Sequence, residues 1–159
     1  SAEAQMASPL FLPYLAGERT PHNDAQVRGS FHGLDFDTDA ARLGYAVIEG
    51  VSLGLKDGMA ALQAAGCHIG TLSLVGGGAR SAFWAQLLSS ALDTEVVTHD
   101  TSAVGGALGA ARLAWLATGT PPAEVCRVPP VLARYQPDNA EQERLEARYT
   151  RFRSLYRRA

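Results

Sequence analysis

The feature best suited to chemistry is a run of three glycines, Gly76, Gly77 and Gly78, between a short apolar run, Thr71–Val75, and a segment with helical spacing. A ligand can approach the backbone of such a turn closely, because glycine has no Cβ atom. The helix that follows would offer unpaired N–H groups and the positive end of its dipole. A strand, a glycine turn and a helix in this order predict a nucleotide site. A turn that binds nothing is the alternative that the pattern alone leaves open.

Comparison of the glycines with known motifs leaves two nucleotide-binding folds as candidates. The P-loop pattern G-x-x-x-x-G-K-[ST] is absent. A Rossmann fingerprint needs three glycines, and Gly76 and Gly78 fit whereas Ser81 stands in the third place. Its acidic residue at the tip of the second strand would be Asp100. The actin-like kinase fold also places adenosine on a strand that ends in Gly-Gly and is followed by a helix.

The elements around this turn alternate between strand and helix. After Thr71–Val75, predicted as a buried strand, apolar spacing predicts a helix over Arg80–Ala91, a second strand over Glu95–Thr98 and a helix over Ala103–Ala117. This order is typical of an α/β layer with a parallel pair of strands.

A long helix precedes this layer, from about Asp39 to Ala65, with apolar residues near every fourth position. Asp37 or Thr38 is suited to cap its start, and Gly66 to end it. A glycine stripe on one face predicts that another backbone packs closely there: Gly50, Gly54 and Gly58.

The two ends of the chain are less regular. Residues 1–38 are predicted to be mostly loop, with extended pieces near Phe11–Tyr14 and Gly29–Leu34, and residues 118–137 to be a connection ending in a strand at Val131–Tyr135. Asp138 with Glu141 resembles a capping box for a last helix. The many arginines of that helix are expected on a solvated face.

Composition excludes several classes of function. The chain has 14 basic and 16 acidic side chains, a balance that gives no attraction to nucleic acid or to an anionic membrane. No apolar run is long enough to span a bilayer, and no signal peptide is predicted. Cys67 and Cys126 are expected to be buried or idle thiols in a reducing cytoplasm. The four histidines are scattered and expected in loops or at the surface, with His22 a candidate for an interdomain cleft.

One segment, Gly29–Glu49, resembles the second signature of the FGGY carbohydrate kinases. One position departs from that signature, Arg42, where the family prefers His, Asp, Glu or Asn. The positions that agree are Gly29, Phe31, Gly33, Leu34, Leu43, Ala46, Val47, Ile48 and Glu49.

Further segments extend the resemblance over nearly the whole chain. Pro13–Asp24 and the closing helix after Tyr135–Pro137 look like those of the xylulokinase branch, and Leu74–Trp84 resembles the family's adenosine-binding segment. The resemblance therefore implies an adenosine site at Gly76, Gly77, Gly78, Ala79 and Ala82. Where some relatives carry an asparagine that contacts adenine, Ala82 offers only apolar contact and backbone.

The resemblance implies an α/β fold, an actin-like ATPase or ribonuclease-H-like domain, with residues 1–159 forming part of a C-terminal kinase domain. It implies transfer of a phosphoryl group from ATP to D-xylulose, giving D-xylulose 5-phosphate and ADP. The sugar site, Mg²⁺ and the catalytic Asp are expected upstream, so no catalytic residue and no metal ligand is predicted here. We expect the chain alone to be inactive and, with an incomplete sheet, to associate as a homodimer. A Rossmann-type domain and a non-catalytic interaction module are the alternatives.

Overall fold

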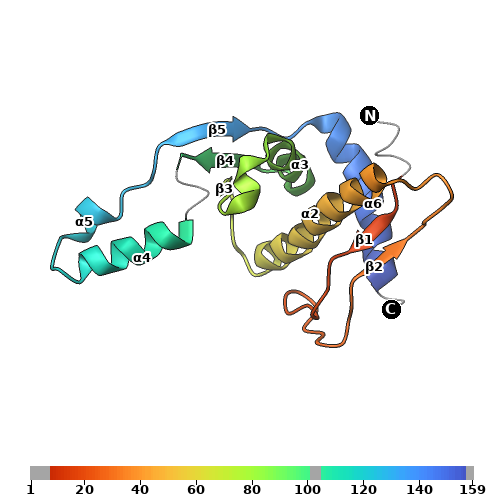
Figure 1. The fold of residues 1–159 in the computed structure, drawn as a ribbon, viewed down its shortest axis with the longest axis horizontal. Helices are drawn as coiled ribbons and strands as arrows, with labels where there is room; N and C mark the ends of the chain where they lie inside the picture. The colour runs from red at the N-terminus through yellow and green to blue at the C-terminus, as the bar shows by residue number, and fades with distance from the viewer. Residues whose placement is uncertain (1–7, 101–104, 157–159) are drawn as a thin grey trace.

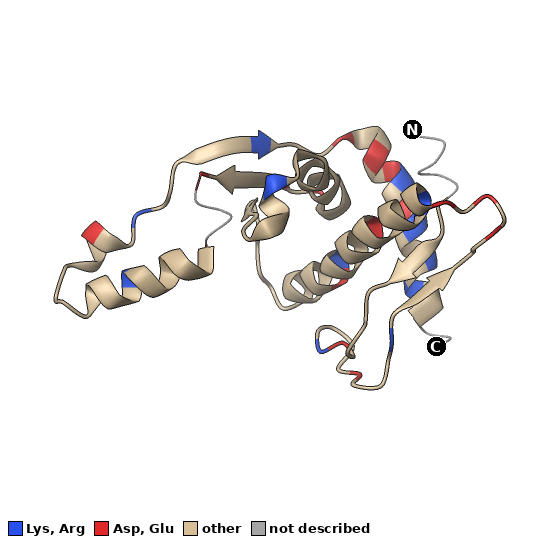
Figure 2. Cartoon of the chain, viewed as in Figure 1, with Lys and Arg blue, Asp and Glu red and all other residues tan. Residues whose placement is uncertain are grey.

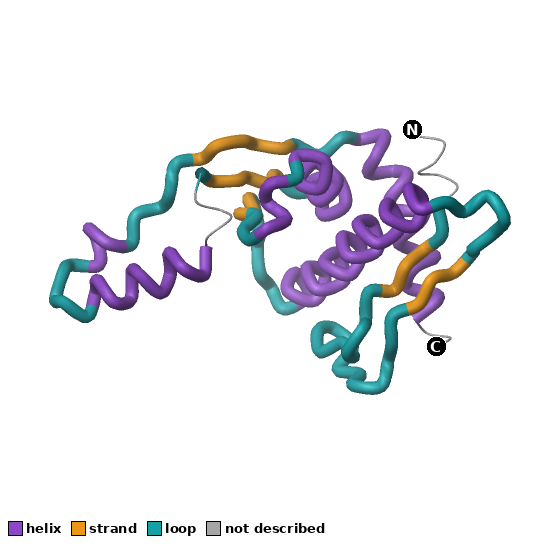
Figure 3. Tube along the Cα trace, in the orientation of Figure 1, coloured by secondary structure: helices purple, strands orange, loops and turns teal. Residues whose placement is uncertain are grey.

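The computed structural model of the chain describes residues 8–100 and 105–156. Helices and short strands alternate, as expected of an α/β protein (Figures 1 and 3). The elements in chain order are β1 (Leu10–Leu12), β2 (Ser30–His32), α2 (Ala40–Ala64), β3 (Thr71–Ser73), the 3₁₀ helix η1 (Gly77–Arg80), α3 (Ala82–Leu92), β4 (Glu95–His99), α4 (Gly105–Leu116), α5 (Pro122–Val125), β5 (Val131–Tyr135) and α6 (Asn139–Tyr156).

The described strands form two sheets. β1 and β2 are an antiparallel pair in which Phe11 lies opposite Phe31. The second sheet has the order β3-β4-β5: β3 and β4 are parallel, whereas β5 is antiparallel to β4. The predicted parallel pair is thus confirmed. The prediction that Thr71–Val75 is a buried strand is wrong, because Thr71 and Ser73 are exposed; within this sheet β4 is the well-covered strand.

Three hydrophobic clusters hold the chain together, and the third joins Leu87 of α3 to Leu145 of α6. In the first, α2 and α6 enclose β1, and Leu12, Leu53 and Phe152 are completely buried. In the second, α3 packs on one face of the three-stranded sheet, where Ala85 and Leu88 meet Val96. The apolar stripe predicted for the last helix is confirmed, since it supplies Phe152 to the first cluster.

The long helix α2 ends where predicted but is capped by a different residue. Asp39 accepts a hydrogen bond from the Arg42 amide at 2.8 Å, so it is the N-cap. The predicted cap Thr38 is instead engaged in the preceding turn, where its hydroxyl donates to Asp35 at 2.6 Å. At the other end Gly66 has φ +90°, a left-handed conformation that suits glycine and stops the helix.

The close approach of another backbone, predicted for the glycine stripe on α2, is confirmed at Gly50 and not at Gly54 or Gly58. A Cβ atom on Gly50 would lie 2.2 Å from the carbonyl oxygen of Phe11, so β1 packs directly on the helix backbone. A Cβ atom on Gly54 would lie 3.2 Å from the Pro13 ring. At Gly58 no atom lies within 4 Å of that place.

The helices α4 and α5 form an arm that stands apart from the rest of the molecule (Figure 1). None of the α4 residues is buried, and the arm carries few charges compared with α6 (Figure 2). The predicted start of this helix at Ala103 lies outside the described residues. The predicted connection 118–137 contains the short helix α5 as well as the expected strand β5.

The structure also bears on the cysteines and on membrane-spanning helices. Cys67 and Cys126 are exposed free thiols rather than buried ones. Within residues 8–100 and 105–156, no helix is sufficiently long and apolar to cross a membrane.

Candidate nucleotide site

The glycine turn is a left-handed residue followed by a turn of 3₁₀ helix. Gly76 has φ +89°, a conformation that L side chains rarely adopt. The Ala79 amide then donates to the Gly76 carbonyl at 3.1 Å, and the Ser81 amide to the Gly78 carbonyl at 3.0 Å. These bonds form η1. The helix predicted over Arg80–Ala91 is confirmed as α3, which begins two residues later than predicted, at Ala82.

The N–H groups near the turn are less available to a ligand than the sequence suggests. Ser81 is the N-cap of α3, and its hydroxyl accepts from the Trp84 amide at 3.2 Å. The Ala85 amide donates to the Ser81 carbonyl. Because the side-chain cap takes up a donor that a ligand would use, the helix end contributes less to binding than the glycine backbone does.

The three glycines face different surroundings. At Gly76 no atom lies within 4 Å of the place of a Cβ atom, and at Gly77 only the end of the flexible Arg80 side chain does, at 3.6 Å. At Gly78 the same place is 2.0 Å from the Trp84 ring. Gly76 and Gly77 thus form an open cradle, a stretch of backbone that a ligand can approach, whereas Gly78 packs against Trp84.

The site lies at the carboxyl end of β3, next to the carboxyl end of β4. In α/β proteins this is the edge of the sheet at which ligands bind. A cavity of about 320 Å³ opens beside the turn, lined by Val75, His99, Gly105 and Leu108 among others. The predicted site residues Gly76–Ala79 and Ala82 are not among its lining residues. The cavity has room for a group the size of a nucleobase.

His99 is buried at this edge, so its predicted place at the surface is wrong. Its Nδ1 donates to the Pro129 carbonyl at 2.9 Å, and its Nε2 is 3.1 Å from the Ser73 hydroxyl. The ring therefore connects β3, β4 and the segment before β5, and it forms part of the wall of the cavity.

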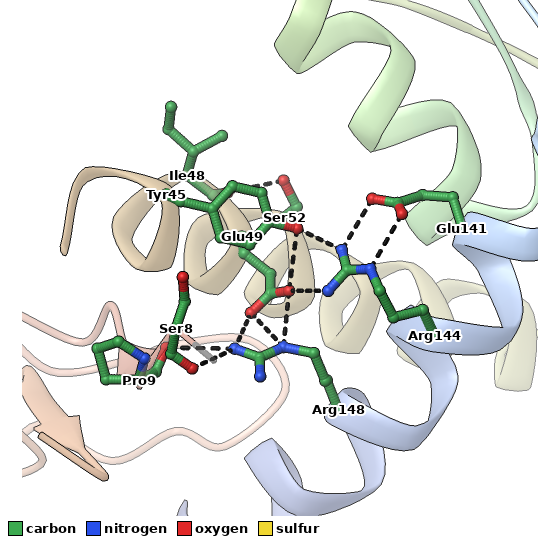
Figure 4. A network of polar contacts seen from close by, with 9 residues as sticks. All are labelled: Ser8, Pro9, Tyr45, Ile48, Glu49, Ser52, Glu141, Arg144 and Arg148. Atoms are coloured by element: carbon green, nitrogen blue, oxygen red, sulfur yellow. Dashed lines mark hydrogen bonds and ion pairs between the residues drawn. The ribbon is translucent and has the colours of Figure 1, made fainter. Parts of the chain in front are cut away.

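A buried charge that sequence reasoning missed joins α2 to α6 (Figure 4). Glu49 is completely buried; Arg144 lies 3.0 Å from its Oε1 and Arg148 lies 2.5 Å from its Oε2. The two arginines were expected on a solvated face, but both side chains are largely covered. Burial, and then the charge of Glu49, raise the pKa of Tyr45 well above its usual range. Glu49 is the acidic end of the FGGY signature, which is the signal that could have found it.

A second buried acid, Asp57, holds the loop that resembles the xylulokinases. His22 from that loop is 3.1 Å from Asp57 Oδ2, and Tyr149 of α6 donates to Oδ1 at 2.5 Å. Burial, followed by the hydrogen bond to Asp57, raises the pKa of Tyr149. His22 is stacked on Tyr156, with ring centroids 3.7 Å apart. The loop is therefore fixed to both long helices.

The other predicted residues lie close to the turn or outside it. Ala79 is half-buried within η1, and Ala82 is exposed at the first position of α3. Asp100, the residue of the Rossmann-type alternative, is exposed just after β4. In the part of the chain that the structure describes, no three His, Cys, Asp or Glu side chains group as they would to hold a metal ion.

Residues 1–118 match the C-terminal domain of the FGGY family of carbohydrate kinases, and the chain belongs to that family. Its fold is the actin-like ATPase fold of these kinases. The chain is 39% identical to a xylulose kinase of Escherichia coli (strain K12) over 155 residues, which are 96% of this chain and 32% of that protein. It is also 40% identical to a gluconokinase of Bacillus subtilis (strain 168) over 113 residues, 69% of this chain and 21% of that protein.

A solved structure agrees with this assignment. A xyloylose kinase from Brucella ovis is 42% identical and superposes with a TM-score of 0.82 over 94% of this chain and 31% of that one. The chain thus spans about a third of the length of the relatives it matches. The family assignment decides against the Rossmann-type alternative.

Proposed function

We propose that the chain is the adenosine-binding part of an ATP-dependent sugar kinase that converts D-xylulose to D-xylulose 5-phosphate and ADP. The observation that carries the proposal is the open backbone of Gly76 and Gly77 at the ligand-binding edge of the sheet, in a chain of a carbohydrate kinase family. Similarity to xylulose kinases favours a pentulose over the gluconate suggested by the gluconokinase relative. In this proposal residues 1–159 are part of the second kinase domain, and the location is cytoplasmic.

The residues of the site suit a flat, uncharged group better than a phosphate. Gly76 and Gly77 leave room for adenine or ribose against the backbone, while Ala79 and Ala82 add apolar surface. Phosphoryl transfer, in contrast, is catalysed by positioned charges and Mg²⁺. Because the chain matches the C-terminal domain of the family, we assign Mg²⁺, the sugar and the catalytic base to the two thirds of the relatives that this chain does not cover.

The binding proposal is tested by calorimetric titration with ADP. We expect weak binding by the chain and at least a tenfold loss in Gly77→Val, whose branched side chain occupies the open cradle. Gly44→Val is the matched control, since Gly44 is an exposed α2 glycine with no atom within 4 Å of its Cβ direction. Equal ADP affinity in the Gly77 and Gly44 variants would remove the turn from the site. Gly78→Val is unsuitable for this test, because the new side chain would collide with the Trp84 ring.

A second test concerns the proposal that the catalytic groups lie outside this chain. A coupled assay of ADP release with ATP and D-xylulose is expected to detect no turnover by the chain. Turnover near the usual kinase value of about 10 per second would place the catalytic groups within these 159 residues and contradict the assignment.

A further inference from the structure

The contact between Gly78 and Trp84 is unusually specific. The three atoms nearest to a Cβ atom on Gly78 would all belong to the Trp84 ring, at 2.0, 2.5 and 3.2 Å. Real Cβ atoms do not approach other atoms so closely, so Gly78 is a glycine because the ring lies against the backbone of the turn. The nucleotide is not needed to explain this position.

The other side of the indole ring is fixed to α2. Its Nε1 donates to the Ser52 hydroxyl at 3.0 Å, and that hydroxyl donates to the Ile48 carbonyl at 2.8 Å. Ser52 is completely buried. Since its single proton is engaged with the helix backbone, the hydroxyl presents a lone pair to the indole and sets the plane of the ring.

We infer that Trp84 is the positioning residue of the glycine turn, and that it links the turn to α2 through the hydroxyl of Ser52. The chain of contacts runs from the α2 backbone to Ser52, to the Trp84 ring and to the backbone of Gly78. It deepens the proposed function, on which its ligand-binding arm rests. Ser52 lies one helical turn after Glu49, so the helix that is fixed to α6 also sets the site.

Trp84 packs against two core clusters as well, and a purely structural role would show mainly in the stability of the whole chain. A positioning role predicts a local effect instead. If the turn leaves its native conformation, nucleotide affinity falls in proportion to the fraction of molecules that remain competent to bind. The experiment therefore compares the turn with the rest of the molecule.

The first arm measures hydrogen exchange at the Ala79 and Ser81 amides, whose bonds form η1. Ser52→Ala is expected to accelerate this exchange about tenfold, because it leaves the half-buried indole N–H without its acceptor. Ser89→Ala is the matched control: Ser89 is equally buried, and its hydroxyl serves the Thr94 and Tyr135 carbonyls instead. Equal acceleration by both variants would overturn the inference.

The second arm uses Trp84 itself as the probe. The chain has two tryptophans, so Trp115→Phe leaves Trp84 as the single emitter. In this background Gly78→Ala is expected to displace the ring toward solvent and shift its emission to longer wavelength, while Gly44→Ala leaves it unchanged. Unchanged emission in a folded Gly78→Ala variant would show that the ring does not support the turn.

The third arm repeats the ADP titration with the two serine variants. We expect Ser52→Ala to weaken ADP binding about tenfold and Ser89→Ala to leave it unchanged. If ADP binds to both variants as to the wild type, the inference fails and the proposed function stands. If ADP does not bind to the wild type, the proposed function fails, and the exchange and emission arms decide the positioning role alone.

Discussion

The helical half of the molecule, made of β1, β2, α2 and α6, differs sharply from the half that carries the glycine turn and the α4–α5 arm. In the helical half the buried charges are paired: Glu49 meets two arginines, and Asp57 meets Tyr149 and His22. In the other half α4 buries no residue, and Trp115 on it is 54% exposed. The first half joins its two long helices through buried charges, whereas the second carries an uncovered helix and the open glycines Gly76 and Gly77. The predictions below test this contrast.

The largest effect is expected at Glu49. Replacing it by Ala leaves Arg144 and Arg148 without their buried partner, which costs about 3–5 kcal/mol in the free energy of unfolding. The matched surface pair joins Lys56 to Glu146, whose side chain is 59% exposed. Glu146→Ala is expected to cost at most about 1 kcal/mol. Urea denaturation of both variants measures the difference, and similar losses would mean that the helical half does not depend on its buried charge.

The next prediction concerns the glycines of α2, for which opposite signs are expected. Gly50→Ala places a Cβ atom 2.2 Å from the Phe11 carbonyl oxygen, so β1 must move away at a cost of about 1–3 kcal/mol. Gly58→Ala has no atom within 4 Å and gains up to about 1 kcal/mol of helix propensity. Thermal denaturation decides the matter, and a stabilised Gly50→Ala variant would refute the close packing of β1 on α2.

Some features of the fold and of the candidate site could be predicted from the sequence, and others could not. Periodicity predicted α2 and α6, because each repeats its apolar positions along the helix, and the alternating order of strands and helices predicted the parallel pair. The glycine turn was found because three consecutive glycines have few structural uses. The separate roles of the three glycines could not be predicted. Gly78 packs on the ring of Trp84, six residues later, and no local sequence pattern indicates that this side chain folds back onto the turn.

Long polar side chains were the other source of error. Arg144 and Arg148 alternate with acidic residues on α6, which is also the pattern of a solvated face. Their guanidinium groups reach a carboxylate about 100 positions earlier in the chain, and only the tertiary fold brings the two together. The FGGY signature marks Glu49 without stating its purpose, which the structure shows to be the attachment of α6.

A smaller effect is expected at high pH. Burial is the main cause that raises the pKa of Tyr14, Tyr45 and Tyr149, and all three lie in the helical half. Their contribution to stability is complete below the unfolded pKa of about 10 and is lost as pH rises toward the higher folded value. We expect at most about 1 kcal/mol per tyrosine for each pH unit above 10, since solvent screens part of the shift.

The measurement is the free energy of unfolding from urea curves between pH 9 and pH 11.5. Tyr149→Phe removes one of the three groups, so the decline with pH should be shallower in this variant than in the wild type. Parallel declines in the two proteins would show that Tyr149 ionises equally in the folded and unfolded states.

The smallest effect on stability, and the most informative for assembly, is expected at the outer edge of β3. Neither β4 nor the Gly50 face of α2 is open to a second copy: β4 lies between β3 and β5, and Gly50 is covered by Phe11. Within the described residues β3 pairs only with β4, so its other edge is open to a strand of a second copy. Thr71→Lys adds a charge there and is expected to change the unfolding free energy by less than about 0.5 kcal/mol.

Association should respond far more strongly, because a charged edge opposes strand pairing. Sedimentation velocity over a concentration series is expected to show self-association of the wild type and mainly monomer for Thr71→Lys. Thr150→Lys is the control, since it adds the same charge at an exposed position on α6. A wild type that remains monomeric at high micromolar concentration would mean that the half with the glycine turn is as self-sufficient as the helical half. The contrast between them would then concern only the candidate site.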